Sequence, residues 1–321
     1  MSDEGFLYLP DGALEALGIA PGEVADAIEK ALIQKSEGAL HTTPKSALLP
    51  GDARYMMSTL AVGNAEDLTV LKQVSVCPEN PGRGLPAING AIMALDAQTG
   101  LLRAILGANW ITGARTAALS AVAARRLANP ASKSVAFVGA GVQASTHLAA
   151  FMELFPLEEV RVYGRGAANA DRLCAEAKAK GLAARRAATP QEALEGVDLV
   201  VTSVTLDYAI APFLDAGWLK PGAFAAITDL GIPWHQESLK AFGQAVIDER
   251  EQEAASERKM IPPEIVGADL TELVSGAKPL RYDPARPSCF AFRGIALGDY
   301  AATALVLERA QAAGAGQRVT A

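Results

Sequence analysis

The sequence predicts an α/β protein with two domains, one of them built on a parallel β-sheet. Three observations lead to this fold class. The chain has 321 residues, more than the roughly 100–200 of a typical single domain. From residue 134 onwards, short apolar runs alternate with helical patterns, which is typical of βαβ units. In the first third of the chain, strand-like runs follow one another directly, which indicates an antiparallel or mixed sheet.

The composition is that of a folded protein with an aliphatic core. Hydrophobic residues make up 50% of the chain and aromatic residues only 6%. The formal net charge is -7 without a basic block, which argues against nucleic-acid binding because that depends on Lys and Arg side chains. Residues 1–5 lack the basic start of a secretory signal, and no apolar run is long enough to span a bilayer. We therefore expect a cytoplasmic protein without a membrane segment.

The cysteines and histidines give no sign of a metal site. Each type occurs three times, far apart and without the spacing of metal ligands. We expect free, buried thiols in a reducing compartment and no bound metal. The residues are Cys77, Cys174, Cys289, His41, His147 and His235.

The first predicted domain is an α+β domain over residues 1–118. Residues 21–38 carry a helical apolar stripe. At the other end of the chain, residues 296–312 are expected to form an amphipathic helix, with a frayed end after Gly314.

Consecutive strands form the sheet of this domain. Residues 68–76 are rich in β-branched side chains and partly alternate apolar with polar positions. Residues 87–95 form another strand, the turn 96–100 follows, and residues 101–106 return as its hairpin partner. Hairpin connections join antiparallel strands, so we expect an antiparallel or mixed sheet with the helix 21–38 packed on it.

The second predicted domain covers residues 119–295. A helix over 114–128 leads into it, rich in Ala and Leu and without Gly or Pro. Strands then alternate with helices, which predicts a parallel sheet. The expected strands are 134–138, 160–163, 198–204, 223–228 and 245–247, and the expected helices end near Phe151 and cover 168–179.

A glycine-rich turn follows the first of these strands and opens a helix. Gly139 permits a tight turn, Gly141 lets backbone N–H groups approach a pyrophosphate, and the small Ala144 lets helix and strand pack closely. The phosphates would lie at the positive N-terminus of the helix. This strand–turn–helix context favours a bound dinucleotide over a turn without a ligand, and makes the second domain a Rossmann dinucleotide-binding domain.

The end of the second strand bears on the choice between NAD(H) and NADP(H). A carboxylate there binds the ribose 2′-hydroxyl of NAD, whereas an arginine accommodates the 2′-phosphate of NADP. The sequence has Gly164 and Arg165 at this point and no carboxylate. Because an arginine can form a charge-assisted contact with a phosphate, we favour NADP(H). A solvated Arg165 with bound NAD(H) stays an alternative.

Basic residues of the first domain are candidates for binding an acid. Lys72 lies within the strand 68–76, and Arg115 lies near the start of the next helix. A lysine in a strand usually extends to solvent. Together with Lys45 and Arg54, however, the two predict a cationic cluster that would hold a substrate carboxylate.

At these residues the sequence resembles the ornithine cyclodeaminase/mu-crystallin family, over nearly the whole chain. The run 111–118 around Arg115, combined with Gln143 and Ala144 at the end of the glycine turn, is the more specific part. The other matches are Met56 in a short loop, Lys72, residues 78–80, 84–86, Gly90, the turn 96–100, residues 202–205, 292–294 and Asp299.

The resemblance implies that residues 1–118 form a domain for substrate binding and dimerisation, that the last helix within residues 296–321 returns to complete it, and that residues 119–295 form a Rossmann domain. A homodimer is implied as well. It also implies that Lys72 and Arg115 contact the substrate carboxylate, that Lys45 replaces an earlier family arginine, and that Thr116 lies near the cofactor phosphates. Activities in the family include ornithine cyclisation to proline, alanine dehydrogenation and reduction of ketimines or cyclic imino acids.

Two positions depart from the family's pattern. Ornithine cyclodeaminases have a glutamate two residues before the position of Met56, where it works with the substrate's amines. This chain has Arg54, which would repel a second ammonium and favour a second anion. Asp229 matches the family's aspartate in a Gly-Asp-x-Pro-like segment, but offset by two residues. Both departures weaken the cyclodeaminase interpretation.

The sequence therefore predicts an NAD(P)H-dependent reductase that converts a small α-imino acid to the amino acid. Lys72, Asp229 and water are the candidate proton donors, and Arg54 points to a dicarboxylic imine such as iminosuccinate. The alternatives are an ornithine cyclodeaminase that releases ammonia and a crystallin-like protein that binds cofactor without turnover. The predicted substrate residues are Lys45, Arg54, Met56, Lys72 and Arg115, and the predicted cofactor residues are Arg115, Thr116, Gly139, Gly141, Val142, Gln143, Ala144, Gly164, Arg165, Thr202, Ser203, Val204 and Asp229.

Overall fold

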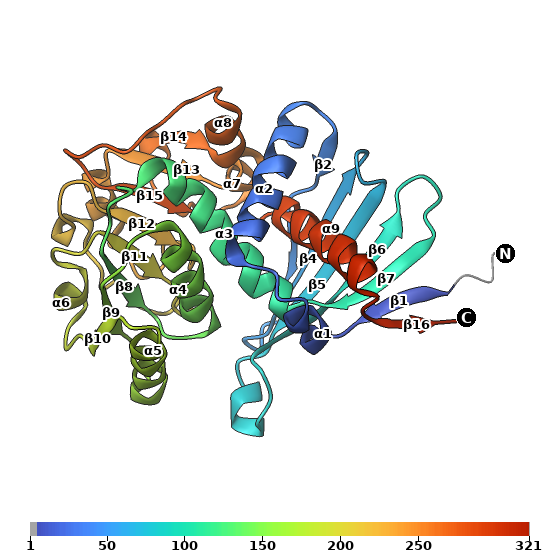
Figure 1. The fold of residues 1–321 in the computed structure, drawn as a ribbon. Helices are drawn as coiled ribbons and strands as arrows, with labels where there is room; N and C mark the ends of the chain where they lie inside the picture. The colour runs from blue at the N-terminus through green and yellow to red at the C-terminus, as the bar shows by residue number, and fades with distance from the viewer. Residues whose placement is uncertain (1–4, 321) are drawn as a thin grey trace. The chain divides into compact units, whose positions relative to one another are not determined.

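The computed structural model describes residues 5–320, and the chain divides into two units, each built on one eight-stranded sheet (Figure 1). Unit 1 joins Met1–Arg115 to Ile295–Ala321, and unit 2 is Thr116–Gly294. Residues 1–4, on which the expected absence of a secretory signal partly depends, lie outside the described residues. No helix within residues 5–320 is long and apolar enough to cross a membrane.

The sheet of unit 1 is mixed, with strand order β16-β1-β7-β6-β5-β4-β2 and β3 also paired with β4. Only the pair of β1 and β7 is parallel among these pairings of the described chain. The predicted hairpin of β6 and β7 is confirmed. The strands are β1 (Phe6–Leu9), β2 (Leu40–Thr42), β3 (Ser46–Leu48), β4 (Tyr55–Gly63), β5 (Leu68–Val76), β6 (Ile88–Asp96), β7 (Leu102–Gly107) and β16 (Gln317–Val319).

Two predictions for unit 1 are wrong. Met56 lies inside β4 and not in a short loop, because it pairs with Leu48 on one side and Ser75 on the other. The chain after Gly314 is not frayed, because β16 pairs with β1 at the edge of the sheet, where Figure 1 shows the two strands side by side. Strand β16 pairs with a strand from the other end of the chain, which a local pattern does not reveal, whereas β4 pairs with its sequence neighbours β3 and β5.

Helices α2 and α9 cover one face of this sheet (Figure 1). On β5, the residues of that face are buried: Leu68, Val70, Lys72 and Val74. Leu71 between them is only half-buried, as the two-residue period of a strand requires. The helices and the short turn of unit 1 are α1 (Asp11–Ala16), α2 (Pro21–Ser36), η1 (Asn80–Arg83) and α9 (Ala296–Ala313).

The long helix α3 (Asn109–Leu127) begins in unit 1 and ends in unit 2. It starts five residues before the predicted position 114. The Trp110 N–H of its first turn donates to Asp11 Oδ1 at 2.8 Å, so a side chain distant in sequence satisfies a backbone donor at the helix start. That cap belongs to the tertiary fold, and the local sequence did not predict it.

The sheet of unit 2 is parallel throughout the described strands, in the order β10-β9-β8-β11-β12-β15-β13-β14. All residues of β8 are buried, as expected for a central parallel strand. This is the predicted Rossmann architecture, and the α/β fold class is confirmed. The strands are β8 (Ser134–Val138), β9 (Glu159–Tyr163), β10 (Ala183–Arg186), β11 (Leu199–Thr202), β12 (Phe224–Ile227), β13 (Gln244–Ile247), β14 (Val266–Asp269) and β15 (Ser288–Ala291).

The helices of unit 2 alternate with its strands. The α4 helix directly follows β8, and α5 directly follows β9, as the sequence predicts. The helices are α4 (Val142–Leu154), α5 (Ala167–Ala179), α6 (Pro190–Leu194), α7 (Arg250–Ala255) and α8 (Leu270–Ser275), with single turns η2 (Ala216–Trp218), η3 (Gln236–Ala241) and η4 (Pro263–Ile265).

Candidate functional site

A buried cluster of opposite charges lies in unit 1, between the sheet and α9. Lys72 Nζ donates to Asp299 Oδ1 at 2.6 Å, and Thr59 Oγ1 donates to Asp299 Oδ2 at 2.8 Å. All three side chains are buried. Thr59 and Lys72 are directly opposite each other on β4 and β5, so one carboxylate from α9 reaches both. Buried charges are costly unless paired, and this pairing satisfies both oxygens of the acid.

Arg115 brings a second positive charge to the same acid. Its Nε lies 3.0 Å from Asp299 Oδ1, in an ion pair that lacks the alignment of a hydrogen bond. Its Nη1 is buried and has no hydrogen-bond partner among residues 5–320. One carboxylate thus faces two cations, which leaves the cluster with a net positive charge. A buried N–H without a partner costs free energy, and an anionic ligand would satisfy it.

The environment shifts the proton affinities of the cluster. Burial, and then the positive charge of Arg115, lowers the pKa of Lys72 to about 8, while Asp299 acts in the opposite direction. Burial also raises the pKa of Asp299, but Lys72 and Arg115 outweigh it and hold that pKa below its usual value. Lys72 is therefore mostly protonated at neutral pH and loses its proton at mildly alkaline pH.

The other predicted substrate residues lie at different places in unit 1. Lys45 lies with its ammonium 5.9 Å from the centre of the Tyr55 ring, and its charge also lowers the pKa of Lys72. Arg54 lies on the loop before β4, half exposed, where it pairs with Asp52 at 2.6 Å. The structure thus groups Lys72 with Arg115, keeps Lys45 within electrostatic range and leaves Arg54 outside the buried cluster.

The glycine turn of unit 2 is shaped by close backbone contacts. Gly139 has a φ of 98°, and a Cβ on it would lie 2.5 Å from the Ser203 carbonyl oxygen. Only glycine fits there without strain. Around Gly141, in contrast, a Cβ would meet nothing within 4 Å. The turn therefore has a tight inner side and an open outer side.

The start of α4 offers unpaired polar groups beside this turn. Gly141 at the N-cap has no side chain to satisfy the N–H groups of the first helical turn, and Val142 is 68% exposed. Gln143 Oε1 and Ser203 Oγ are buried without a hydrogen-bond partner within the described chain. These features fit a dinucleotide whose pyrophosphate lies at the helix N-terminus.

Asp229 follows β12 in unit 2 and is buried. Its Oδ1 accepts from Thr202 Oγ1 at 3.0 Å, and its Oδ2 accepts from the Val204 N–H at 3.1 Å. Burial raises the pKa of Asp229 to about 6, against the lowering effect of these two hydrogen bonds. The predicted residues Thr202, Ser203, Val204 and Asp229 therefore form one connected edge of the parallel sheet, at the carboxyl ends of β11 and β12, where ligands of such folds bind.

The predicted residues at the end of β9 also lie near the glycine turn. A Cβ on Gly164 would lie 3.9 Å from the Ala140 backbone nitrogen. Arg165 is exposed, and it forms no hydrogen bond or ion pair with other residues of the described chain. Arg172 on α5, which the sequence reasoning did not single out, reaches the Ala140 carbonyl oxygen at 3.3 Å.

Two further groups were missed as functional candidates. Asp299 was noted only as part of a motif, although an acid in the otherwise apolar first half of α9 is a signal of a buried ion pair. Ser120 on α3 and His147 on α4 form a buried hydrogen bond of 2.9 Å. His147 Nδ1 contacts the Gln143 carbonyl oxygen, so Nδ1 carries the proton and Nε2 accepts from Ser120. Burial lowers the pKa of His147 to about 4, so this link to the helix of the glycine turn stays neutral.

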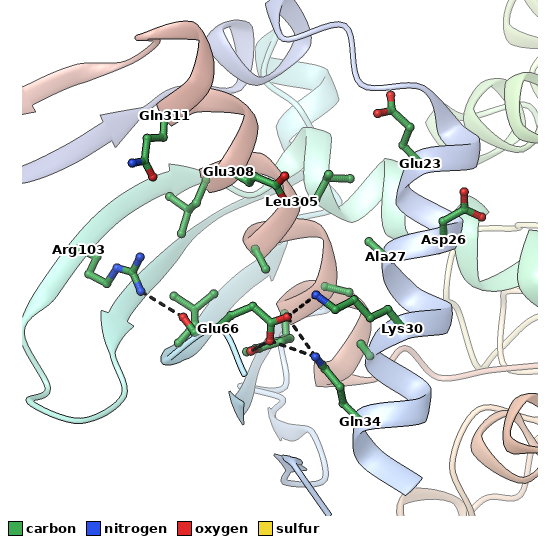
Figure 2. Close-up of a pocket in the computed structure, with 16 residues that line it drawn as sticks. Glu23, Asp26, Ala27, Lys30, Gln34, Glu66, Arg103, Leu305, Glu308 and Gln311 are labelled. Carbon is green, nitrogen blue, oxygen red and sulfur yellow. Dashed lines mark hydrogen bonds and ion pairs between the residues drawn. The ribbon is translucent and has the colours of Figure 1, made fainter. Parts of the chain in front are cut away.

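Unit 1 has a separate hollow of about 570 Å³, bounded by α2, α9 and the hairpin of β4 and β5 (Figure 2). Glu66 lies at its centre and accepts from Lys30 at 2.8 Å and from Gln34 at 3.1 Å. Tyr300 also donates to Glu66, at 2.7 Å. These hydrogen bonds connect α2 and α9 to the β4–β5 hairpin. The polar side chains of Glu66, Lys30, Gln34 and Tyr300 are therefore paired with one another.

Known proteins resemble this chain over most of its length. The family model described as "Ornithine cyclodeaminase/mu-crystallin family" matches residues 15–314. The chain belongs to this family. Among its members, the ketimine reductase mu-crystallin of Mus musculus is 32% identical over 252 residues, which covers 77% of this chain and 78% of the mouse protein.

Two solved structures of similar proteins cover almost the whole chain. The Thermococcus litoralis Δ¹-pyrroline-2-carboxylate reductase, in complex with NADH and L-proline, has a TM-score of 0.89 and 26% identity, over 98% of this chain and 100% of that one. An archaeal alanine dehydrogenase dimer with bound NAD has a TM-score of 0.87 and 25% identity, over 98% and 99% of the two chains. The α/β architecture of this chain is therefore that of its family.

Proposed function

We propose that this protein reduces the C=N bond of a small α-imino acid with NAD(P)H to give the α-amino acid. The observation that carries the proposal is the buried pair of Lys72 and Arg115, with net positive charge and an unpaired guanidinium N–H. Such a group suits the carboxylate that every α-imino acid carries. Relatives named as ketimine reductase and pyrroline-2-carboxylate reductase support it.

The residues of the chain have separate roles in this proposal. Lys72 and Arg115 bind the carboxylate and fix the α-carbon for reaction. When bound, the reduced nicotinamide cofactor supplies the hydride. The imine nitrogen needs a proton, and Lys72 with a pKa of about 8 and Asp229 with a pKa of about 6 both have affinities suited to donate one near neutral pH. Water is the third candidate donor.

Oxidation of NADH and NADPH at 340 nm tests the proposal. The substrates are Δ¹-pyrroline-2-carboxylate, iminosuccinate, and pyruvate with ammonia. Turnover of at least one imine with stoichiometric formation of the amino acid is the expected result. Ammonia release from ornithine without a change at 340 nm would instead identify a cyclodeaminase. Cofactor binding without turnover of any substrate would identify a binding protein.

The charge of the cluster favours a substrate with one carboxylate. The net positive charge of Lys72, Arg115 and Asp299 balances one anion, and a second anion would need another cation, either Lys45, which lies within electrostatic range of Lys72, or Arg54. Comparing wild type with Arg54→Ala separates the two cases. A loss confined to iminosuccinate assigns Arg54 to the second carboxylate, whereas equal rates remove that role.

We infer that NADP(H) is preferred over NAD(H). Arg165 is exposed and forms no hydrogen bond or ion pair within residues 5–320 that would have to break, and Arg172 lies against the glycine turn. Two guanidinium groups near the end of β9 suit a 2′-phosphate. Replacing Arg165 by Ser should raise the KM for NADPH about tenfold and leave the KM for NADH within twofold. Equal changes for both cofactors would remove Arg165 from phosphate binding.

We infer further that a second copy of the chain covers the open face of the sheet in unit 1. One row of apolar residues crosses five strands in register: Leu60, Leu71, Met93, Ile105 and Tyr8. Leu60, Met93 and Tyr8 are each about 40% exposed. A continuous apolar row of this kind is typical of an interface, and closed dimers are the commonest assembly. The archaeal alanine dehydrogenase is named as a dimer.

Sedimentation of a charged variant tests the homodimer. Met93→Glu places a charge in the middle of the row and should convert a dimer to monomers. Leu101→Glu is the matched control, because Leu101 is exposed but lies outside the row, in the turn before β7. A wild-type protein that sediments as a monomer, or a dimer unaffected by Met93→Glu, would contradict this interface.

A further inference from the structure

We propose that Asp299 is a positioning residue for the reaction: it keeps the Lys72 ammonium charged and directs its remaining N–H groups to the substrate carboxylate. The inference rests on the proposed function, since it assigns a role to a residue of the same cluster. Asp299 itself is not expected to touch the substrate, because its oxygens already bind Lys72 and Thr59.

The charged groups around Lys72 are mostly positive. The charged groups that face it are Arg115 from α3, Lys45 from the segment between β2 and β3, and Asp299 from α9. Two of the three are cations, and the Lys72 side chain is buried. Burial and like charge both favour the neutral amine. Asp299 is the acid in this group that opposes them, at 2.6 Å.

Hydrogen bonds to both of its oxygens fix the Asp299 carboxylate beside Lys72. A lysine ammonium has three N–H donors, and Asp299 Oδ1 accepts one of them. The other carboxylate oxygen is fixed by Thr59, directly across the β4–β5 pair from Lys72. With both oxygens held, the carboxylate cannot rotate away, and the remaining N–H groups of Lys72 point in defined directions.

The packing around Asp299 holds α9 in its rotation. Tyr300, next to Asp299, is buried and donates to Glu66 at 2.7 Å. A Cβ on Gly63 would lie 2.1 Å from the Tyr300 hydroxyl oxygen, so glycine leaves the room for that ring. Glu66 is in turn held by Lys30 and Gln34 of α2, as Figure 2 shows. Asp299 is thus anchored to β4 and β5 and Tyr300 to the turn between these strands, which fixes where the Asp299 carboxylate points.

The test is the pH dependence of kcat/KM and of L-proline affinity in Asp299→Asn. This variant keeps the volume of the side chain and removes its charge. The alkaline limb is the fall of kcat/KM at high pH as Lys72 loses its proton. In the variant this limb should lie at least one pH unit lower than in wild type, and kcat at the variant's own pH optimum should be about tenfold lower. Glu308→Gln is the matched control, because it removes one negative charge from an exposed position on the same helix and should leave the limb in place.

The result that overturns the proposal is an alkaline limb in Asp299→Asn that stays at the wild-type pH. A purely structural role for Asp299 would lower the amount of folded protein without moving the limb. Binding of NADPH checks that the variant is folded.

A second variant covers the case in which Asp299→Asn does not fold. Thr59→Val removes the hydrogen bond that holds the second oxygen of Asp299, so the carboxylate is free to turn away from Lys72. The alkaline limb should therefore move a fraction of a unit to lower pH, in the same direction as in the first variant. An unchanged limb, or a shift to higher pH, overturns the proposal.

Titration of Lys72 by NMR of lysine-¹⁵N-labelled protein separates this inference from the proposed function. The measurement needs no substrate. An enzyme without turnover defeats the proposed function, whereas equal Lys72 titration in wild type and in the variant defeats the role of Asp299.

Discussion

The buried cluster of Lys72, Arg115 and Asp299 in unit 1 and the glycine turn of unit 2 present positive charge by different means. The cluster uses buried side chains: Lys72, Arg115 and Asp299 come from three elements that are far apart in the sequence. The turn uses the backbone, with Gly139 and the uncapped start of α4 within a few consecutive residues. The first carries formal charge, and the second carries only the partial charge of a helix N-terminus.

This difference predicts different sensitivities. A side-chain site depends on the identity and protonation of single residues, so it should respond strongly to mutation and pH. A backbone site depends on the space around the chain, so it should respond to the addition of one methyl group and little to pH. Mutation of the cluster should therefore have the largest effect on activity, methyl groups at the glycine turn an intermediate one, and pH the smallest.

Loss of the Lys72 charge should have the largest effect. Lys72→Met keeps the length of the side chain and removes a charge-assisted hydrogen bond, so kcat/KM for the imino acid should fall about 100-fold. The affinity for NADPH should stay within twofold. Steady-state kinetics and cofactor titration measure both, with Lys133→Met as the control, since Lys133 forms an exposed ion pair with Glu158 in unit 2. A similar fall of kcat/KM in Lys72→Met and Lys133→Met would contradict a specific role for the Lys72 charge.

Methyl groups on the two glycines should have separable effects of intermediate size. Gly141→Ala meets no atom within 4 Å, so the fold should be unaffected, while cofactor affinity falls about tenfold because the methyl group occupies the approach of the phosphates. Gly139→Ala combines a positive φ with a 2.5 Å contact, so it should also destabilise the protein by about 1–3 kcal/mol. Thermal unfolding and cofactor titration measure the two. Unchanged affinity in Gly141→Ala would remove the turn from the cofactor site.

A change of pH should have the smallest effect, and it should act on the Lys72 cluster and not on the glycine turn. Lys72 has a lowered pKa of about 8, so its charge is present below that pH and lost above it. Binding of a carboxylate should weaken in the same direction, and kcat/KM should fall to half near pH 8 and decline further above it. Cofactor affinity should stay constant from pH 7 to 9. A kcat/KM that rises across this range would contradict a role for protonated Lys72.

The contrast also explains how much could be predicted from the sequence. The glycine turn and its helix were predicted because strand, turn and helix are consecutive, and local patterns carry that information. The strand that bears Lys72 was predicted with its observed bounds for the same reason. The α/β class followed from the spacing of such elements.

The parts that the sequence did not reveal depend on distant partners. The bond between Lys72 and Asp299 joins residues 227 positions apart, and that between Thr59 and Asp299 joins residues 240 apart. The pairing of β16 likewise needs β1, from the other end of the chain. Arg54 was predicted as a substrate cation from an aligned position alone, and its pairing with Asp52 on an exposed loop could not be read from that alignment.

The most direct test of the central claim is a crystal structure with cofactor and an α-amino acid product such as L-proline. The account predicts that the carboxylate of the amino acid accepts hydrogen bonds from Lys72 Nζ and Arg115 Nη1, with the pyrophosphate at the N-terminus of α4. A carboxylate bound elsewhere, with Arg115 Nη1 still unpaired, would contradict it.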